Sequence, residues 1–293
     1  MSFVDAKTGL YGVFGDPVGH SLSPVLHNWF MRRFGINGVY MAFAISADRL
    51  QKAIQALPTL GFVGVNITIP HKEAVLAYVN HCDLQAEIIG AANTIRIVDN
   101  RVDAYVTDAD GFVLSLHKQQ QRFHNASVVM LGAGGAARSI AYALARLQVA
   151  RLAIINRTYS RAESLARFVR ERFQLPDTKA LPEGEQLEGL SSADIVINTT
   201  SVGMYPYTSE SLVKDPRVFH NGQLVYDLIY NPSATRLLHD ARRNGAEIQN
   251  GLDMLIYQGL VSLNIWRQDT YELRAADLQE LRQVLTQELA AHE

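Results

Sequence analysis

The apolar residues of this chain follow two spacings in turn, one typical of strands and one typical of helices. Short apolar runs predict strands at residues 10–15, 39–43 and 62–69. Apolar residues three or four positions apart predict helices at residues 23–34 and 47–57. Alternation of this kind predicts an α/β fold.

The pattern continues through the middle and the end of the chain. Two short runs, 95–98 and 102–106, flank the turn Asp99-Asn100 and predict a hairpin. Helical spacing over residues 254–266, followed by leucines spaced along one face up to Leu289, predicts two C-terminal helices. Four later runs are mostly apolar, as expected for buried parallel strands: residues 127–131, 152–155, 193–198 and 224–228.

A glycine-rich turn follows the first of these buried strands and opens a helix. Gly132 permits the tight turn, Gly134 lets the backbone approach a pyrophosphate, and the small Ala137 allows close packing of helix on strand. The helix N-terminus offers free N–H groups to phosphates. We therefore predict a dinucleotide-binding unit; the alternative is a purely structural glycine turn. The predicted cofactor contacts in the turn are Gly132, Ala133, Gly134, Gly135 and Ala136.

The residues at the end of the next strand bear on the choice between NAD and NADP. No carboxylate stands there to hold a ribose 2′-hydroxyl, as it would in an NAD site. Arg157 can pair with a 2′-phosphate in two-pronged geometry, and Arg161 follows one turn later. Asn156 and Thr158 add hydrogen-bonding groups. The sequence therefore predicts NADP(H), the alternative being that both arginines are solvated surface charges.

Several polar residues stand where predicted strands and helices begin or end. Asn66 and Thr68 lie at the carboxyl end of a strand, where open α/β sheets bind ligands. Lys72 lies in the first turn of a predicted helix, where a positive charge is unfavourable because the helix dipole is positive at that end. Locally unfavourable residues of this kind are expected at functional sites. A small sheet could gather these residues with Asn93 and Asp108 at one edge. The structural alternatives are a surface lysine and, for Asp108, a helix N-cap.

Two serines stand beside the start of the helix predicted at residues 23–34. Hydroxyls at a helix N-terminus can form a corner that binds a carboxylate, and Ser21 and Ser23 are the candidates. For Ser23 the alternative role is the N-cap of the helix, with Pro24 in the first turn.

Composition narrows the class of protein. The 293 residues are enough for about two domains, and 48% hydrophobic with 19% charged residues is ordinary for a globular enzyme. A net charge of −2 gives no long-range attraction to nucleic acid or anionic membranes, and no apolar run approaches a membrane span. The single Cys82 excludes an internal disulfide. The first residues lack the basic and apolar blocks of a signal peptide, so we expect a cytoplasmic protein. We also expect no metal site.

With these motifs in order, the chain resembles the shikimate dehydrogenase family over essentially its whole length. The resemblance is specific because many motifs occur in the order of the family. They are Ser21-Leu22-Ser23-Pro24, Asn66-Ile67-Thr68-Ile69-Pro70-His71-Lys72, Gly90-Ala91-Ala92-Asn93-Thr94, Thr107-Asp108, Gly132-Ala133-Gly134-Gly135-Ala136, Asn156-Arg157-Thr158, Thr200-Ser201-Val202-Gly203-Met204 and Asp227-Leu228-Ile229-Tyr230.

The resemblance implies a split α/β substrate domain, residues 1–108 plus 253–293, around a Rossmann-type NADP-binding domain at 109–252. It implies reversible reduction of 3-dehydroshikimate to shikimate, by a monomer or homodimer, with Lys72 and Asp108 as the catalytic pair. Ser21 and Ser23 would bind the substrate carboxylate. The remaining substrate contacts would be Asn66, Thr68, Asn93, Tyr230 and Gln258. Further cofactor contacts would be Thr200, Ser201, Val202, Gly203, Met204, Leu228 and Gly251.

Two alternatives stay open at this point. A related enzyme could act on quinate as well as shikimate, with broader substrate or NAD use, and a regulator could keep the fold without turnover. Ala104 and Val106 stand where the family pattern has glycine and asparagine, which bears on substrate preference. Thr107 and Asp108 remain in that pattern, so we expect the catalytic carboxylate to be kept.

Overall fold

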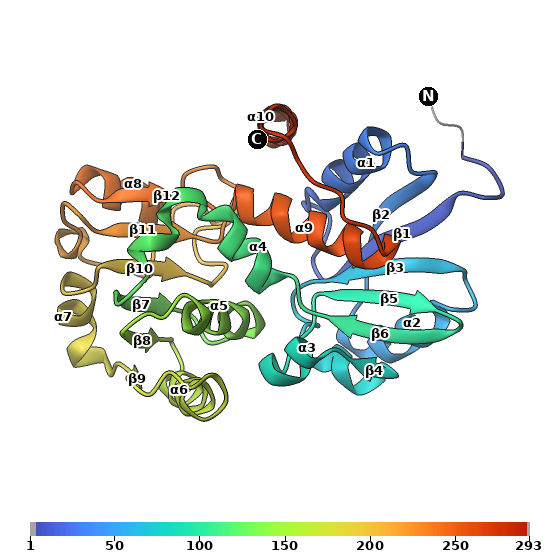
Figure 1. Ribbon diagram of the computed structural model, residues 1–293. Helices are drawn as coiled ribbons and strands as arrows, with labels where there is room; N and C mark the ends of the chain where they lie inside the picture. Colours follow the sequence, from blue (N-terminus) through green and yellow to red (C-terminus); the bar gives the residue numbers. More distant parts are fainter. Residues whose placement is uncertain (1–3, 292–293) are drawn as a thin grey trace. The chain divides into compact units, whose positions relative to one another are not determined.

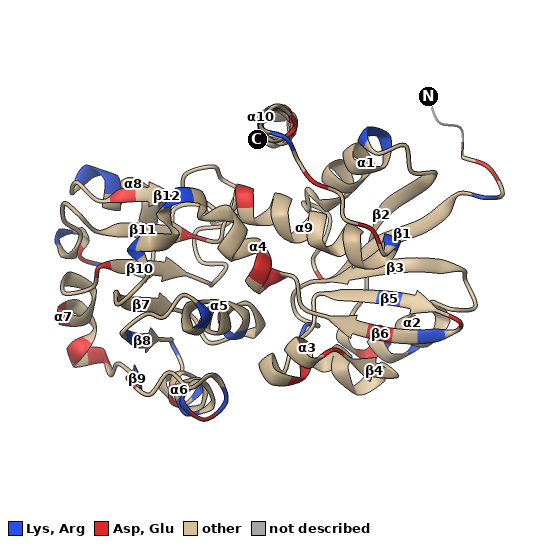
Figure 2. Cartoon of the chain, in the orientation of Figure 1, with Lys and Arg blue, Asp and Glu red and all other residues tan. Residues whose placement is uncertain are grey.

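The computed structural model describes residues 4–291, which form two compact units (Figure 1). The first unit holds the described residues up to Gly111 and those from Leu255 onward, and the second holds Phe112–Met254. The chain passes into the second unit within α4 (Asp108–Ser115) and returns within α9 (Leu252–Arg267). None of the described helices has the length and apolar character needed to cross a membrane. Basic and acidic residues are interspersed along the elements of each unit (Figure 2).

The first unit is built on a mixed six-stranded sheet of order β2-β1-β3-β5-β6-β4. Neighbours β2, β1 and β3 run parallel, whereas β5 is antiparallel to β3 and to β6. Its strands are β1 (Gly9–Gly15), β2 (Gly38–Ala44), β3 (Phe62–Ile67), β4 (His81–Cys82), β5 (Thr94–Val98) and β6 (Arg101–Tyr105). Its other helices are α1 (Ser23–Arg33), η1 (Ala47–Arg49), α2 (Leu50–Ala56), η2 (Ala74–Tyr78), α3 (Leu84–Ile89) and α10 (Ala275–Ala291).

Local sequence explains the turns that bring the polar segments together. Asp83 accepts a hydrogen bond from the Ala86 N–H at the start of α3, and Gly90 ends this helix with a left-handed φ of 70°. Asp99 and Asn100 both have positive φ, as the tight hairpin between β5 and β6 requires. The register then sets Asn66 of β3 opposite Thr94 of β5.

The second unit contains a parallel six-stranded sheet of order β12-β11-β10-β7-β8-β9. Read from the other edge, this is the strand order 3-2-1-4-5-6 of a Rossmann sheet. Its strands are β7 (Ser127–Leu131), β8 (Arg151–Ile155), β9 (Thr178–Ala180), β10 (Ile195–Asn198), β11 (Leu224–Asp227) and β12 (Glu247–Gln249). Its helices are η3 (His117–Arg122), α5 (Gly135–Arg146), α6 (Tyr159–Phe173), η4 (Glu183–Glu185), α7 (Gln186–Ser191), η5 (Pro216–Val218) and α8 (Arg236–Arg243).

Both faces of this second sheet are covered, which explains why its central strands are mostly apolar. Val129 and Val196 pack with Leu238 of α8 in one apolar cluster. Val128 and Met130 alternate with that face along β7 and are also fully buried. Because the strand order reverses between β7 and β10, the loops after these two strands flank the place where open α/β sheets bind nucleotides.

The structure confirms the α/β class and differs from the sequence prediction in local detail. The third strand ends at Ile67 rather than residue 69, so Thr68 lies in the loop beyond it. Residues 70–73 form turns, and the helix expected there is the short 3₁₀ helix η2, which starts at Ala74. Two edge strands, β4 and β9, were not predicted because each is only two or three residues long.

Candidate active site

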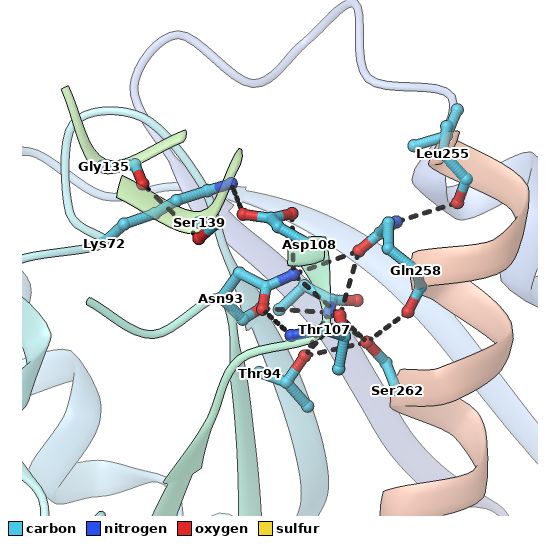
Figure 3. A network of polar contacts seen from close by, with 11 residues as sticks. Lys72, Asn93, Thr94, Thr107, Asp108, Gly135, Ser139, Leu255, Gln258 and Ser262 are labelled. Carbon is cyan, nitrogen blue, oxygen red and sulfur yellow. Dashed lines mark hydrogen bonds and ion pairs between the residues drawn. The ribbon is translucent and has the colours of Figure 1, made fainter. Parts of the chain in front are cut away.

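Lys72 and Asp108 form an ion pair in the first unit, between Nζ and Oδ2 (Figure 3). The lysine side chain is 16% exposed and that of the aspartate 7%, so the pair is shielded without being sealed from a ligand. The Lys72 carbonyl accepts a hydrogen bond from Ala92 at 2.8 Å, which fastens the lysine loop to the segment before Asn93. His71 is buried, with a ring nitrogen 2.6 Å from the Ile45 carbonyl oxygen, so its place is structural.

The Asn93 amide fixes the other side of the carboxylate. The Thr107 N–H donates to Asn93 Oδ1 at 2.6 Å, and an N–H can face only the oxygen of an amide. Asn93 Nδ2 is thereby turned toward Asp108 Oδ1, 3.1 Å away, and Thr107 Oγ1, 2.8 Å away. Two of the predicted residues, Asn93 and Lys72, therefore both donate to Asp108. Asp108 is the first residue of α4, and its carboxylate accepts from both Lys72 and Asn93.

Gln258 approaches this group from α9. Its Nε2 donates to the Leu255 carbonyl at 2.9 Å, which fixes the amide orientation and leaves one N–H unassigned. Its Oε1 lies 3.2 Å from Asn93 Nδ2 and 3.5 Å from Thr107 Oγ1. A Cβ on Gly111 would clash with the Gln258 backbone, so the glycine permits α4 and α9 to meet here.

Asn66 lies deeper, and its amide is engaged by the protein. Tyr40 donates its hydroxyl to Asn66 Oδ1 at 2.7 Å. Asn66 Nδ2 has three acceptors within reach, among them the Asn93 carbonyl at 3.1 Å and Ser262 Oγ at 3.0 Å. Asn66 therefore joins β2, β3, the Asn93 segment and α9.

The side chains of Ser21 and Ser23 do not cap the helix that follows them. The N-cap of α1 is Leu22, without a side-chain hydrogen bond, so the capping role considered for Ser23 is wrong. Instead, Ser21 Oγ accepts from the Ser23 N–H at 3.2 Å. Within residues 4–291, the hydroxyls of Ser23 and Thr68 form no hydrogen bond, and both remain available to a ligand.

The glycine turn of the second unit lies at the point where the strand order reverses. Gly132 has φ of +115°, and a Cβ there would strike Thr199, so the turns after β7 and β10 lie side by side. Gly134, at the N-cap of α5, is extended and exposed, and no protein atom lies within 4 Å of its Cβ position. Ala137, in the first turn of α5, is fully buried, as close packing of this helix requires. Ala133, Gly135 and Ala136 are partly exposed.

The residues predicted to choose the cofactor follow β8. Asn156 Nδ2 donates to the Thr158 carbonyl at 2.9 Å and shapes the turn, and Thr158 is the N-cap of α6. Arg157 and Arg161 are exposed and have no ion-pair partner among the described residues. Both guanidinium groups are therefore free to meet an anion.

A buried polar chain holds the loop after β10. Asp227 accepts from Asn198 Nδ2 at 2.9 Å, and Asn198 Oδ1 accepts from the N–H and hydroxyl of Thr200 at 3.0 and 2.8 Å. Thr200 Oγ1 in turn accepts from the Val202 N–H at 3.1 Å. Burial raises the pKa of Asp227 to about 6, although hydrogen bonds from Thr235, Ile229 and Asn198 lower it. Ser201, Gly203 and Met204 complete the loop, and Gly203 has φ of +93°.

The last predicted cofactor contacts are also neighbours. A Cβ on Gly251 would clash with the Leu228 backbone, so these two residues touch. The Leu228 N–H donates to the Asn198 carbonyl at 3.0 Å, which ties Leu228 to the same polar chain. Tyr230 follows in this second unit and is partly exposed.

Sequence reasoning missed four residues that hold the first-unit site together. Tyr40, Thr94, Thr107 and Ser262 are all buried and hydrogen-bond to Asn66, Asn93 or each other. The one available signal was the spacing of Ser262, one helical turn after Gln258. Residues 4–291 contain no group of three or more His, Cys, Asp or Glu able to hold a metal ion.

Fold and site together define a two-domain α/β dehydrogenase, with a Rossmann-type sheet in one unit and a lysine–aspartate pair in the other. Residues 13–95 match the family model described as shikimate dehydrogenase substrate binding domain, and residues 115–231 match that of shikimate / quinate 5-dehydrogenase. The chain belongs to the shikimate dehydrogenase family.

Individual proteins agree with this assignment. The chain is 40% identical over 270 residues to the shikimate dehydrogenase (NADP(+)) of Caldanaerobacter subterraneus, covering 92% of this chain and 95% of the relative. A crystal structure of a shikimate dehydrogenase in complex with NADP+ superposes with a TM-score of 0.86 at 35% identity, covering 99% and 98% of the two chains. The Thermus thermophilus enzyme in complex with NADP(H) and shikimate gives a TM-score of 0.82 at 32% identity, covering 94% and 100%.

Proposed function

We propose that the protein reduces 3-dehydroshikimate to shikimate with NADPH, and catalyses the reverse reaction with NADP+. The observation that carries this proposal is the Lys72–Asp108 pair, whose carboxylate is also held by Asn93. Relatives named as NADP-dependent shikimate dehydrogenases support it, as does a related structure that contains both ligands.

The proposed role of Lys72 is to give a proton to the ketone oxygen as negative charge develops there. An ammonium group supplies both the proton and electrostatic stabilisation of that oxygen. Asp108 accepts from Lys72 and orients it, and in the reverse direction Lys72 takes the proton from the alcohol. Bound NADPH would supply the hydride, so the chain itself contributes placement and proton transfer.

The substrate carboxylate and hydroxyls need separate partners. The available hydroxyls of Ser21 and Ser23 support carboxylate binding beside the start of α1. The hydroxyl of Thr68 would hold a ring hydroxyl. Asn93 and Gln258 would hold ring hydroxyls close to the proton donor. We keep Asn66 and Tyr230 as further substrate contacts, with Asn66 acting partly through its bonds to the surrounding protein.

The second unit fits NADP(H) on its own features. The open space at Gly134 suits the approach of a pyrophosphate to the N-terminus of α5. The unpartnered Arg157 and Arg161 suit a 2′-phosphate, because an arginine fork binds phosphate oxygens in pairs. We propose that the cofactor is held by these residues and by the remaining members of the set: Gly132, Ala133, Gly135, Ala136, Asn156, Thr158, Thr200, Ser201, Val202, Gly203, Met204, Leu228 and Gly251.

Quinate is the second candidate substrate, because one matching family is described as shikimate / quinate 5-dehydrogenase. Quinate carries one more ring hydroxyl than shikimate, and a pocket lined with hydrogen-bonding groups can offer that hydroxyl a partner. Ala104 and Val106 are fully or nearly fully buried and lie outside the hydrogen-bonded group, so they would affect the choice through packing.

The test measures NADP+ reduction by the purified protein with shikimate and with quinate, each repeated with NAD+. We expect turnover to favour shikimate and NADP+. Lys72→Ala should lower kcat by about 10²- to 10⁴-fold, the usual contribution of a general acid or base. Lys52→Ala, an exposed lysine on α2, is the matched control and should leave kcat unchanged. Binding of both ligands without turnover would favour the regulator, and equal rates with quinate would favour the broader enzyme.

We also propose that the enzyme works in the cytoplasm as a monomer or homodimer. Cell fractionation tests its location, and light scattering after gel filtration tests its assembly.

A further inference from the structure

Ser262 lies where the polar groups of the first-unit site converge (Figure 3). It is fully buried on α9, and its hydroxyl donates to the Gln258 carbonyl at 2.9 Å. Its oxygen also lies 2.8 Å from Thr94 Oγ1, 3.1 Å from Thr107 Oγ1 and 3.0 Å from Asn66 Nδ2. A serine that only filled space in a helix would need none of these last three contacts.

The direction of each hydrogen bond follows from counting donors. A hydroxyl has one hydrogen, and the hydrogen of Ser262 goes to a carbonyl, which can only accept. The Ser262 oxygen is therefore an acceptor toward Thr94 and Thr107. Asn93 Nδ2 donates to Thr107 Oγ1, and of the three oxygens that the Thr107 hydrogen can reach, Ser262 Oγ at 3.1 Å is the nearest. The chain runs from Asn93 through Thr107 and Ser262 to the Gln258 carbonyl.

This direction matters for the side chain of Gln258. The other oxygens in reach of the Thr107 hydroxyl are Thr94 Oγ1, at 3.4 Å, and Gln258 Oε1, at 3.5 Å. Gln258 Oε1 already has Asn93 Nδ2 at 3.2 Å, which leaves it one lone pair. As long as Ser262 takes the hydrogen of Thr107, that lone pair can accept from a ligand hydroxyl. The free N–H of Gln258 remains available at the same time, because Nε2 uses only one hydrogen on Leu255.

We infer that Ser262 is a positioning residue for substrate binding: it takes the Thr107 hydrogen bond and so leaves one acceptor position of the Gln258 amide oxygen open for a ring hydroxyl. The inference rests on the proposed function, in which Gln258 contacts the substrate. Ser262 itself touches neither substrate nor cofactor.

Ser262→Ala should raise the shikimate KM and the calorimetric shikimate Kd about tenfold, the effect of losing one hydrogen bond of about 1.4 kcal/mol. The KM for NADP+ should not change. In a Gln258→Ala background, Ser262→Ala should have little further effect, because the amide oxygen that it frees is absent. Ser262→Cys fills the site with a weaker acceptor, and should give the same pattern if the alanine variant folds poorly.

Ser115→Ala is the matched control. Ser115 is also a fully buried helix serine that donates to its own helix, to the Phe112 carbonyl at 2.7 Å, and contacts a second hydroxyl, that of Tyr226. Its removal should lower stability without changing the shikimate KM.

An unchanged shikimate Kd in Ser262→Ala would overturn the inference. So would a parallel rise in the KM for NADP+, or full additivity with Gln258→Ala. Failure of the proposed function would look different, because the wild-type protein would then not reduce NADP+ with shikimate at all. The calorimetric Kd still tests Ser262 if shikimate binds without turnover, and absence of shikimate binding would overturn both proposals.

Discussion

Gly132 and Gly134 stand two residues apart and are glycines for different reasons. Gly132 is required by the protein, because its φ is positive and a Cβ would strike Thr199. Gly134 has an ordinary extended backbone and open space where its Cβ would lie. Nothing in the described protein demands glycine at 134, so the demand is best explained by a ligand.

Gly134→Ala therefore separates cofactor binding from folding. We expect the KM for NADP+ to rise at least about tenfold, because a methyl group would keep a phosphate from the N–H groups of α5 and weaken charge-assisted hydrogen bonds. Alanine is a poorer N-cap than glycine, so stability should fall by no more than about 1 kcal/mol. Kinetics with NADP+ and thermal unfolding of the free protein measure the two effects.

Gly132→Ala is the comparison and should unfold at a clearly lower temperature. If Gly134→Ala bound NADP+ as well as the wild type, the pyrophosphate would not lie at this turn.

Among the elements, α9 does most to assemble the first-unit site. Gln258, Ser262 and Trp266 are spaced by four residues and so lie along one stripe of the helix. Trp266 covers Gly64 of β3, Ser262 contacts Asn66, and Gln258 reaches Asn93. The helix thus runs antiparallel to β3. The packing of Trp266 against the sheet therefore also fixes the position of Gln258 along the helix axis.

Gly64→Ala tests this coupling, because the new Cβ would clash with the indole of Trp266. Overpacking of this kind costs about 1–3 kcal/mol of unfolding free energy. Any shift of α9 would also move Gln258, so we expect a lower kcat/KM for shikimate. Denaturant unfolding and steady-state kinetics measure the two effects.

Gly184→Ala is the control, since no atom lies within 4 Å of its Cβ position. Normal stability and activity in Gly64→Ala would show that α9 accommodates the change.

The same element shows how far sequence reasoning reaches. The apolar spacing predicted α9, and Gln258 was assigned as a substrate contact through the family resemblance. It did not reveal Ser262, because a helix serine that bonds its own carbonyl is unremarkable until the strand opposite is known. Likewise the polar face of β3 suggested a ligand surface at Asn66, whereas much of that face is covered by α9.

Motifs at element ends were easier to interpret than lone residues. The glycine turn and its flanking strands predicted the second sheet, because its central strands are buried on both faces and therefore mostly apolar. Lys72, Asn93 and Asp108 were grouped on their positions alone, and the structure brings them into contact. For Ser23 the capping signal misled, because helix starts are fixed by the surrounding chain as well as by the capping side chain.

At the scale of the molecule, the two units carry buried titratable groups whose effects on stability have opposite signs. His27, in the first unit, is fully buried and stacked on Tyr40, and burial lowers its pKa to about 3 despite an opposing effect of Asn66. Asp227, in the second unit, is fully buried with a pKa raised to about 6. The ordinary values are 6.5 for the histidine and 3.8 for the aspartate.

The signs follow from which state binds the proton. Below pH 6.5 the unfolded chain protonates His27 while the folded chain does not, so the first unit loses stability as the pH falls. Between pH 6 and pH 3.8 the folded chain protonates Asp227 while the unfolded chain does not, so the second unit gains stability over that range. At pH 5 the loss from His27 is about 2 kcal/mol and the gain from Asp227 about 1.4 kcal/mol, at about 1.36 kcal/mol per pKa unit.

Calorimetry at pH 7 and pH 5 should therefore show the unfolding of the two units moving apart, since multidomain chains need not unfold as one. Ligands identify the two transitions, because NADP+ should raise the unfolding temperature of the second unit and shikimate that of the first. His27→Phe keeps a ring against Tyr40 and should abolish the acid loss of the first unit. Asp227→Asn keeps an acceptor for Asn198 and should abolish the acid gain of the second. If either wild-type shift persisted in its variant, the titration of that residue would not be its cause, and the opposition between the units would have to come from other groups.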